Sequence, residues 1–399
     1  MSSRFLQFHT LTSYPATLLN RDDAGFAKRM PFGGAVRTRI SSQCLKRHWR
    51  VYDGENSLGE IDAPETVRSR ISFEKHIVDP LVADGVPRER ARTAAQKIAG
   101  SILGSEQKKA KAGKRGEKKI ADASEPQDSP VKTAQVTVLG RLELDYLRDL
   151  ALEAIDKAGD DEKKLAQLLD ERLKNKNLKK NIAALMPGSL EAGLGAALFG
   201  RMVTGDVLAR TDAAIHVAHA LTVHGQMSES DYFSAIDDLV REEGEQGSGH
   251  INASELTSGL FYGYVVVDVN GLVKNLGEDS EARNLASEVV HRLVHIVATV
   301  SPGAKKGSTA PYAYSHLVLA EAGKAQPRTL QNAFLDPVRT TGHVVDNAYQ
   351  ALQDHLRDLD DMYGKSEQRA HAGLKTKDYF DTGMNLAALA DWAKEQVLA

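Results

Sequence analysis

The side chains best suited to chemistry in this sequence are hydroxyls, an amide and cations gathered in one short stretch. They are Ser41, Ser42, Gln43, Lys46, Arg47 and Arg50. A helix is expected through Trp49 with Ser41 or Ser42 as its N-cap, because a serine before an apolar run at helical spacing is typical of a helix start. Lys46 and Arg50 then share one face. Free N–H groups, hydroxyls and cations at a helix start are typical of phosphate binding, and a solvated basic helix is the alternative.

The charge around this stretch differs from that of the whole chain. The protein has 51 Lys and Arg against 54 Asp and Glu, a net charge of -3 that does not by itself indicate a polyanionic partner. From Arg21 to Arg50, however, there are eight basic and two acidic residues. From Gly225 to Leu260 there are eight acidic residues and only Arg241 is basic. A basic site and an acidic excursion therefore coexist in one chain.

Candidates for catalysis are weak when they are taken one at a time. His291 and His295 have a spacing that can bind zinc, but the motif HRLVH lacks the glutamate that would act as a base. Cys44 falls in the expected amphipathic helix, where a buried thiol is the common role. Asp22 and Asp23 could hold magnesium, yet adjacent side chains on an extended segment diverge. No phosphate-binding loop or dinucleotide fingerprint is present, so we expect no catalytic residue, no metal site and no cofactor.

The bulk composition fits a cytoplasmic protein of one or two domains. The chain has 399 residues, of which 42% are hydrophobic and 26% charged. Its single cysteine excludes an internal disulfide and favours a reducing compartment. Neither a signal peptide nor a run of about 18 apolar residues is present, so export and membrane insertion are not expected.

The first and middle parts of the chain predict the strands that would carry this site. Arg4 to Thr12 reads as a strand that ends at Ser13-Tyr14-Pro15. Phe32-Gly33-Gly34 predicts a turn before a second strand, Ala35 to Ile40. Alternation of apolar positions predicts a strand over Ala213 to His224.

Later segments complete an α+β pattern. Phe261 to Val269 is the strongest strand, and the roughly thirty-five residues before it are too long for a tight turn. A helix from Ser280 to Val300 is followed by a strand from His316 to Ala320, and the C-terminal third reads as helical. Leu142 to Leu185 predicts a helix pair. These elements suggest a β-α-β-β-α-β sheet with helices on one face.

Several long motifs, in order, resemble one known family. They are NRDD, FGG and RTRISSQCLKR, then GRMVTGDV, TDAAIHVAHALTVH, DYFSAIDDL, GHINASELTSGLFYGYVVVD and VSPGAKKG. Over most of residues 3–335 the chain resembles the CasC family, the backbone subunit of the type I-E CRISPR surveillance complex Cascade. It departs from that family in the Lys-rich segment 105–130 and in Tyr232, where a tryptophan is expected.

The resemblance implies a fold and a domain organisation. The family has an RNA-recognition-motif-like (ferredoxin-like) palm, helical fingers and an inserted thumb hairpin. Residues 1–51, 186–224 and 260–399 would form the palm, and residues 52–185 would form the fingers, with the Lys-rich loop 105–130. Residues 225–259 would form the thumb.

The resemblance also implies which residues meet the guide RNA. Those expected to contact its backbone are Arg21, Lys28, Ser41, Gln43, Lys46 and Arg50, with Lys305 and Lys306 in a second basic loop. Met202, Phe233 and Ile251 would supply apolar surfaces against bases at kinks in the RNA. For Met202 and Ile251, packing in a hydrophobic core is an equal alternative.

The implied function is a non-catalytic scaffold in antiviral defence. Such a subunit polymerises as a helical homo-oligomer along a CRISPR guide RNA (crRNA), presents the guide to target DNA and assembles with CasA, CasB, CasD and CasE into a ribonucleoprotein. One alternative is a metal-dependent ribonuclease that cuts bound target RNA, with Asp22 and Asp23 as the nearest candidates. Another is a free-standing general RNA-binding protein.

Overall fold

The computed structural model describes residues 4–103, 130–174, 178–202, 208, 210–236, 248–381 and 383–399, with the side chains of 233–236, 248–252 and 377 left out. By its internal contacts the chain divides into two units. Unit 1 comprises Met1–Ile61, Ile215–Val269 and Asn284–Ala399, and unit 2 comprises Asp62–Ala214 and Asn270–Arg283. No helix in the described ranges is long and apolar enough to cross a membrane.

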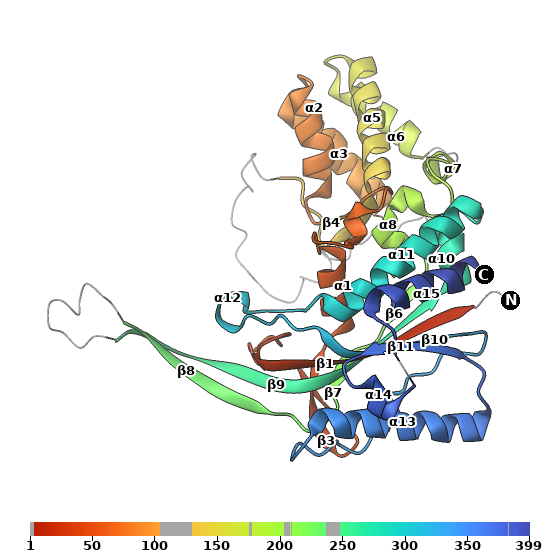
Figure 1. The fold of residues 1–399 in the computed structure, drawn as a ribbon. Coiled ribbons are helices and arrows are strands. Elements are labelled where there is room, and N and C mark those ends of the chain that lie inside the picture. Colours follow the sequence, from red (N-terminus) through yellow and green to blue (C-terminus); the bar gives the residue numbers. More distant parts are fainter. Residues whose placement is uncertain are drawn as a thin grey trace. The chain divides into compact units, whose positions relative to one another are not determined.

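Unit 1 is built on an antiparallel sheet with the order β11-β10-β1-β9-β7-β3-β2, while β6 and β8 also pair with β9 (Figure 1). The strands are β1 (Phe5–Thr17), β2 (Arg29–Phe32), β3 (Ala35–Ile40), β6 (Ile215–Val217), β7 (Ala220–Thr222), β8 (Ser228–Ile236), β9 (Ser248–Asp268), β10 (Ser315–Gly323) and β11 (Gln368–Gly373). The predicted mixed α+β class is confirmed.

The first strand is longer than its sequence suggests. β1 confirms the predicted strand but continues through Pro15 to Thr17, so the predicted break is wrong. Its pairing with β10 ends at Thr12, whereas pairing with β9 continues with a register shift between Tyr14 and Thr17. Ala16, at φ +45°, lies in this irregularity. The proline is tolerated because it falls where the strand has one partner and the ladder is already interrupted.

The Gly33-Gly34 turn joins β2 to β3 as predicted. Both glycines have positive φ, +57° and +77°, as a two-residue hairpin turn requires. A Cβ on Gly33 would also lie 1.5 Å from the Leu335 carbonyl oxygen, so no other residue fits there without a backbone shift. This turn fixes the register that places β3 directly before the helix of the candidate site.

The strand predicted over Ala213 to His224 is in fact two short strands, β6 and β7. Both pair with β9, and Ala218 and His219 lie between them. The Ala218 N–H donates to the Tyr264 carbonyl oxygen, which keeps this gap against β9. The alternating pattern holds only for Ile215 and His216, because every residue from Ala220 to His224 is buried, and it does not reveal where a ladder is interrupted.

Helices cover both faces of the unit 1 sheet (Figure 1). They are α1 (Ser42–Arg50), α11 (Ser280–Thr299), α12 (Lys306–Thr309), α13 (Val344–Tyr363), α14 (Thr376–Tyr379) and α15 (Leu386–Leu398), with short 3-10 turns at Leu58–Glu60 and Gln331–Phe334. Leu11 and Tyr262 pack in one core with Leu352 of α13. Trp49 of α1 and Val297 of α11 line a cavity of about 40 Å³ on the opposite face. The expectation of helices on one face only is therefore wrong.

The predicted helix from Ser280 and the predicted strand from His316 are confirmed as α11 and β10. The C-terminal third contains the predicted helices and also β11, which the prediction omitted. The long excursion before the Phe261 strand is a hairpin, since β8 pairs with β9 from Ser228↔Thr257 to Ile236↔Ser248. In Figure 1 the two strands of this hairpin extend together beyond the rest of the sheet.

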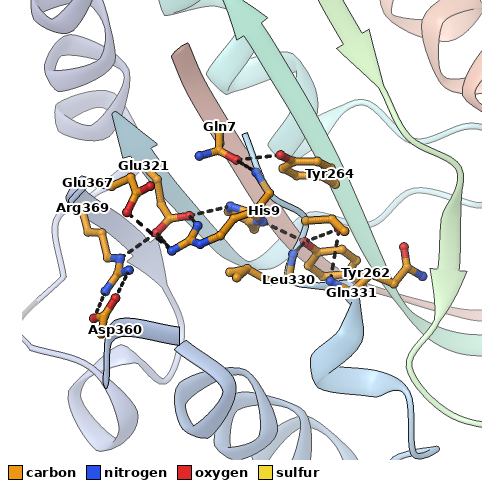
Figure 2. A network of polar contacts seen from close by, with 12 residues as sticks. Gln7, His9, Tyr262, Tyr264, Glu321, Leu330, Gln331, Asp360, Glu367 and Arg369 are labelled. Carbon is orange, nitrogen blue, oxygen red and sulfur yellow. Dashed lines mark hydrogen bonds and ion pairs between the residues drawn. The ribbon is translucent and has the colours of Figure 1, made fainter. Parts of the chain in front are cut away.

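A buried polar network lies where β9, β1 and β10 meet (Figure 2). His9 is fully buried, donates Nε2–H to Glu321 over 3.2 Å and accepts the Tyr262 hydroxyl proton at Nδ1 over 2.8 Å. Tyr262 in turn accepts the Leu330 N–H. Burial lowers the pKa of His9, which favours a neutral ring and so assigns Nε2–H as the donor to Glu321 and Nδ1 as the acceptor from Tyr262.

Glu321 is the centre of this network. It accepts two hydrogen bonds from Arg328, at 2.6 and 3.2 Å, and one from Arg369 at 2.7 Å. Arg369 also binds Asp360, at 2.6 Å through one of its nitrogens. Burial alone would raise the pKa of Glu321, but hydrogen bonds from His9 and Arg328 lower it below the usual range. The network thus joins β1, β10, β11 and α13 through one buried carboxylate.

Unit 2 is mainly helical. Its elements are β4 (Thr66–Ser69), a π-helical turn (Glu74–Val78), α2 (Asp79–Ala83), α3 (Arg88–Ile102), β5 (Thr137–Gly140), α5 (Arg141–Ala158), α6 (Glu162–Leu173), α7 (Leu178–Ala183), a 3-10 turn (Leu190–Ala192), α8 (Leu194–Phe199) and α10 (Val269–Leu276). Apolar faces of α3, α5 and α6 form one core. The predicted helical region from Leu142 is confirmed, with α7 as a third helix. The Lys-rich segment lies outside the described residues except for Pro130.

Candidate nucleic-acid interface

The segment between β1 and β2, residues 18–28, carries the first predicted RNA contact, Arg21, and we call this segment the arm. Arg21 and Ala27 form an antiparallel bridge, and the Lys28 N–H donates to the Asn20 carbonyl oxygen. Inside this loop the Asp22 carboxylate accepts the Phe26 N–H at 2.9 Å. Asp22 therefore closes a turn, while the Arg21 side chain is exposed.

The arm is joined to α1 through the helix cap. Ser41 Oγ accepts the Cys44 N–H at 3.3 Å, which confirms Ser41 as the predicted N-cap. The Ser41 N–H donates to the Asn20 side-chain oxygen at 2.9 Å. Ser41 is only 7% exposed, and its hydroxyl already serves the fold as the helix cap. Its contact with RNA stays a prediction.

The N-terminus of α1 is less open than the sequence suggests. The Ser42 N–H donates to His219 Nδ1 at 3.2 Å, and the Cys44 N–H is used by the cap. The expectation of free N–H groups is therefore wrong at these two positions. The reason is tertiary, because His219 lies 177 residues further along the chain.

His219 lies within the predicted concentration of positive charge, and its place there is what sequence reasoning missed. Its pKa is lowered, first by partial burial and then by the charges of Arg39, Lys28 and Lys46. Arg39 Nη1 also lies 3.4 Å from His219 Nδ1. Cations from the arm, β3 and α1 thus lie around one imidazole. The histidine lies in the motif TDAAIHVAHALTVH, but nothing in that motif indicates that its side chain meets β3 and α1.

The remaining side chains of α1 divide between core and surface. Leu45 and Trp49 are buried, whereas Gln43 is exposed and Lys46 and Arg50 are partly exposed. Since the apolar pair packs on the sheet, the polar side chains lie along the outer part of the helix. This agrees with the predicted separation of faces.

The second predicted basic loop lies beside the arm and α1. The Gly303 N–H donates to His48 Nε2 at 3.4 Å, and the Ala304 N–H donates to the Leu18 carbonyl oxygen at 3.0 Å. Lys305 and Lys306 follow directly, partly exposed and exposed respectively. Two basic segments about 280 residues apart in the sequence therefore meet in unit 1.

These three segments surround an open groove of about 480 Å³. Its lining comprises Leu19, Asn20, Arg21, Asp22, Asp23 and Gly25 of the arm, Cys44 and His48 of α1, and Gly303 and Ala304 of the second loop. We call the cations of these segments, namely Arg21, Lys28, Lys46, Arg50, Lys305 and Lys306, the basic surface. Arg21 lines the groove together with Asp22 and Asp23, and the other five cations belong to the segments that border it or follow them in the chain. Cations on segments around a groove suit a phosphate backbone.

One basic residue counted in this stretch serves the fold instead. Arg37 is completely buried and donates to the carbonyl oxygens of Phe32, Thr222 and Phe334. The strand pattern of β3 predicted no such role, because two of the three acceptors, Thr222 of β7 and Phe334 of a 3-10 turn, lie 185 and 297 residues away in the sequence. Arg37 is therefore not available to a ligand.

The predicted base-contacting residues lie in separate parts of the chain. Met202 belongs to unit 2 and is 85% exposed, so core packing, its alternative role, is wrong. The backbones of Phe233 and Ile251 lie on β8 and β9, where they pair with Asn252 and Ser234. Their side chains lie outside the described part of the chain.

The groups considered for catalysis have other surroundings. Burial raises the pKa of the Cys44 thiol despite the opposing charges of Arg47 and Lys28, which disfavours a thiolate. His291 lies 3.4 Å from Asp391, an ion-pair distance. Within the described ranges no group of three or more His, Cys, Asp or Glu side chains could hold a metal ion.

The chain belongs to the CT1975-like protein family of CRISPR-associated proteins, whose family model matches residues 6–394. It is similar to a chain of the solved structure "CRISPR RNA-guided surveillance complex, pre-nicking", with 26% identity, a TM-score of 0.74 and coverage of 98% of this chain and 100% of that one. A chain of a "CRISPR RNA-guided surveillance complex" shares its fold at 21% identity and a TM-score of 0.64, over 98% and 99% of the two chains. A comparison with curated proteins gives no match. The CRISPR-associated part of the predicted resemblance is confirmed, and the CasC subtype stays a prediction.

Proposed function

We propose that this protein is a non-catalytic backbone subunit of a CRISPR surveillance complex, which polymerises along the guide RNA and presents it to target DNA. One observation carries the proposal. The segments predicted to hold RNA, far apart in the sequence, border one groove that Arg21 lines. The likeness to a chain of an RNA-guided surveillance complex supports it over nearly the full length.

The strand order supports an RNA-recognition-motif-like palm. Four strands lie in the order β10-β1-β9-β7, all antiparallel to their neighbours. α1 lies between β1 and β7 in the chain, and α11 lies between β9 and β10. A β-α-β-β-α-β ferredoxin-like sheet has this strand order and a helix in each of these two connections, which supports the proposed palm.

In the proposed complex the basic surface holds phosphates without reading bases. Lysine and arginine contacts to phosphate carry no sequence information, so any guide would be bound alike. The β8–β9 hairpin, the proposed thumb, would act on the RNA of a neighbouring copy. The type I-E assignment, the partners CasA, CasB, CasD and CasE, and a cytoplasmic location belong to this proposal. The ribonuclease alternative gains no support from Asp22, which caps a turn.

Co-expression with the neighbouring genes and a CRISPR array tests the proposal. The purified complex is expected to contain RNA of one guide length and several copies of this chain. With about four phosphate contacts per subunit, the logarithm of the binding constant should fall with the logarithm of salt concentration with a slope of roughly -3 per copy.

Two results would overturn the proposal. Tight binding of RNA of mixed length by the chain alone, without oligomers, would indicate a free-standing RNA-binding protein. Periodic, magnesium-dependent cuts in complementary RNA would indicate the ribonuclease.

A further inference from the structure

Two tyrosines are held out to solvent on the loop that carries Lys305 and Lys306. Tyr312 is 70% exposed and Tyr314 is 75% exposed. Burial of an aromatic ring is a large favourable term in folding, so two neighbouring rings left in water indicate a ligand or partner surface. None of the contacts considered above uses them.

The loop that presents the rings is fixed at its base. Ser301 Oγ donates to the Ala313 carbonyl oxygen and accepts the Ala313 N–H, both at 3.0 Å. Beyond Tyr314, Thr12 Oγ1 and Ser315 Oγ lie 2.8 Å apart where β1 meets β10. A ring on a fixed base loses less conformational freedom on binding than a ring on a free chain.

The chemistry around the rings favours an anion that carries planar groups. Lys306 Nζ lies 5.8 Å from the centroid of the Tyr312 ring, within cation–π range. Residues 301–315, SPGAKKGSTAPYAYS, contain two lysines and no carboxylate. The same loop contacts α1 and the arm through Gly303 and Ala304.

We propose that Tyr312 and Tyr314 stack on unpaired bases of the guide RNA, while Lys306 contacts the adjoining phosphate. The inference rests on the proposed function and adds a stacking site to its phosphate site. Base stacking on an aromatic ring tolerates any base, so it suits a protein that must hold every guide. The rival occupant of a basic, aromatic loop is the acidic β8–β9 segment of a second copy.

The test compares Tyr312→Ala/Tyr314→Ala with the wild-type chain in binding to single-stranded RNA. Stacking contributes about 1 to 3 kcal/mol per base, so the double variant should bind at least about five-fold more weakly. Because no charge is removed, the salt slope should be unchanged. Tyr312→Phe/Tyr314→Phe keeps both rings and should retain wild-type affinity.

An RNA of the same length without bases makes the test specific. It keeps the phosphates and removes the stacking partners, so the wild-type protein should prefer ordinary RNA. The double Ala variant should lose most of that preference. Tyr363→Ala is a matched control, because Tyr363 is 71% exposed at the end of α13. It should bind both RNAs as the wild type does.

The outcomes separate this inference from the proposed function. If wild-type protein binds RNA and the double Ala variant keeps both its affinity and its preference for bases, the stacking site is refuted and the phosphate site stands. If the variant loses self-association without RNA, or loses only pairing with target DNA, the rings serve another contact. If wild-type protein binds no RNA, the proposed function itself fails.

Discussion

The buried network around Glu321 and the basic surface both gather arginine or lysine side chains in unit 1, but they balance charge differently. In the network each of two arginines meets a carboxylate directly, and the central carboxylate is completely buried. Around His219, by contrast, the charges that shift its pKa are all positive. Side chains that neutralise each other in place stabilise a fold, whereas an excess of one sign is available to an oppositely charged partner.

The strongest test of this comparison is Glu321→Gln, which removes the central charge and keeps the shape. Arg328 and Arg369 would then each lose the buried carboxylate, keeping only Glu367 and Asp360 as partners, at a cost of about 3 kcal/mol in the free energy of unfolding. Urea titration would measure it. Asp354→Asn is the control, because Asp354 pairs with Arg357 at the surface and should matter by less than about 1 kcal/mol. Equal effects would mean that the network does not hold this part of the sheet.

The basic surface should behave in the opposite way. Lys46→Ala/Arg50→Ala is expected to leave the free energy of unfolding within about 1 kcal/mol of the wild-type value but to reduce the salt slope of RNA binding by about 1.4, since each lost phosphate contact removes roughly 0.7. At moderate salt this is a loss of affinity of about ten-fold for every guide sequence. Filter binding at several salt concentrations would show it. Lys75→Ala/Arg357→Ala, at exposed positions on other helices, should leave RNA binding unchanged.

Acid should lower the free energy of unfolding through the two titratable groups of the network, His9 and Glu321. The pKa of His9 is lowered by burial, so the unfolded chain takes up a proton below pH 6.5 while the folded chain does not. The pKa of Glu321 is also lowered, which adds a loss below pH 4.5. As the pH falls through its window, each group lowers the free energy of unfolding by up to about 1.4 kcal/mol per pH unit.

Denaturation at pH 7.5 and at pH 5.5 would check this expectation. His9→Gln should be less stable than the wild type at pH 7.5, and the difference should shrink by up to about 1.4 kcal/mol at pH 5.5. His224 and His316, whose pKa values burial also lowers, titrate alike in both proteins. A constant difference would mean that His9 is not held neutral.

The smallest expected effect concerns Ser41, which caps α1 and is also a predicted RNA contact. Ser41→Ala removes the N-cap of α1 and should cost about 1 kcal/mol. Ser41→Asn can cap the helix and should restore stability. If Asn also restores RNA affinity, Ser41 acts only as a cap. If affinity stays low while stability returns, the hydroxyl itself contacts RNA, as the resemblance implies.

Local patterns predicted the elements of the site well. Gly33-Gly34, the capped start of α1 and the apolar spacing of α11 depend on neighbours in the chain, so sequence reveals them. Pro15 misled because a register irregularity on a strand with one partner can accommodate it. The hydrogen bond from the Ser42 N–H to His219 could not be predicted, because His219 lies 177 residues further along the chain, between β6 and β7.

The sequence by itself determined the cation-rich stretch, the strands and helices that carry it, and the α+β class, because charge, capping and periodicity are local properties. Tertiary structure alone decided which charges neutralise each other. His9 and Glu321 are 312 residues apart, and only the pairing of β1 with β10 brings them into contact. Tertiary structure also set the loop of Lys305 and Lys306 beside the arm, since the Ala304 N–H donates to the carbonyl oxygen of Leu18, 286 residues away in the sequence.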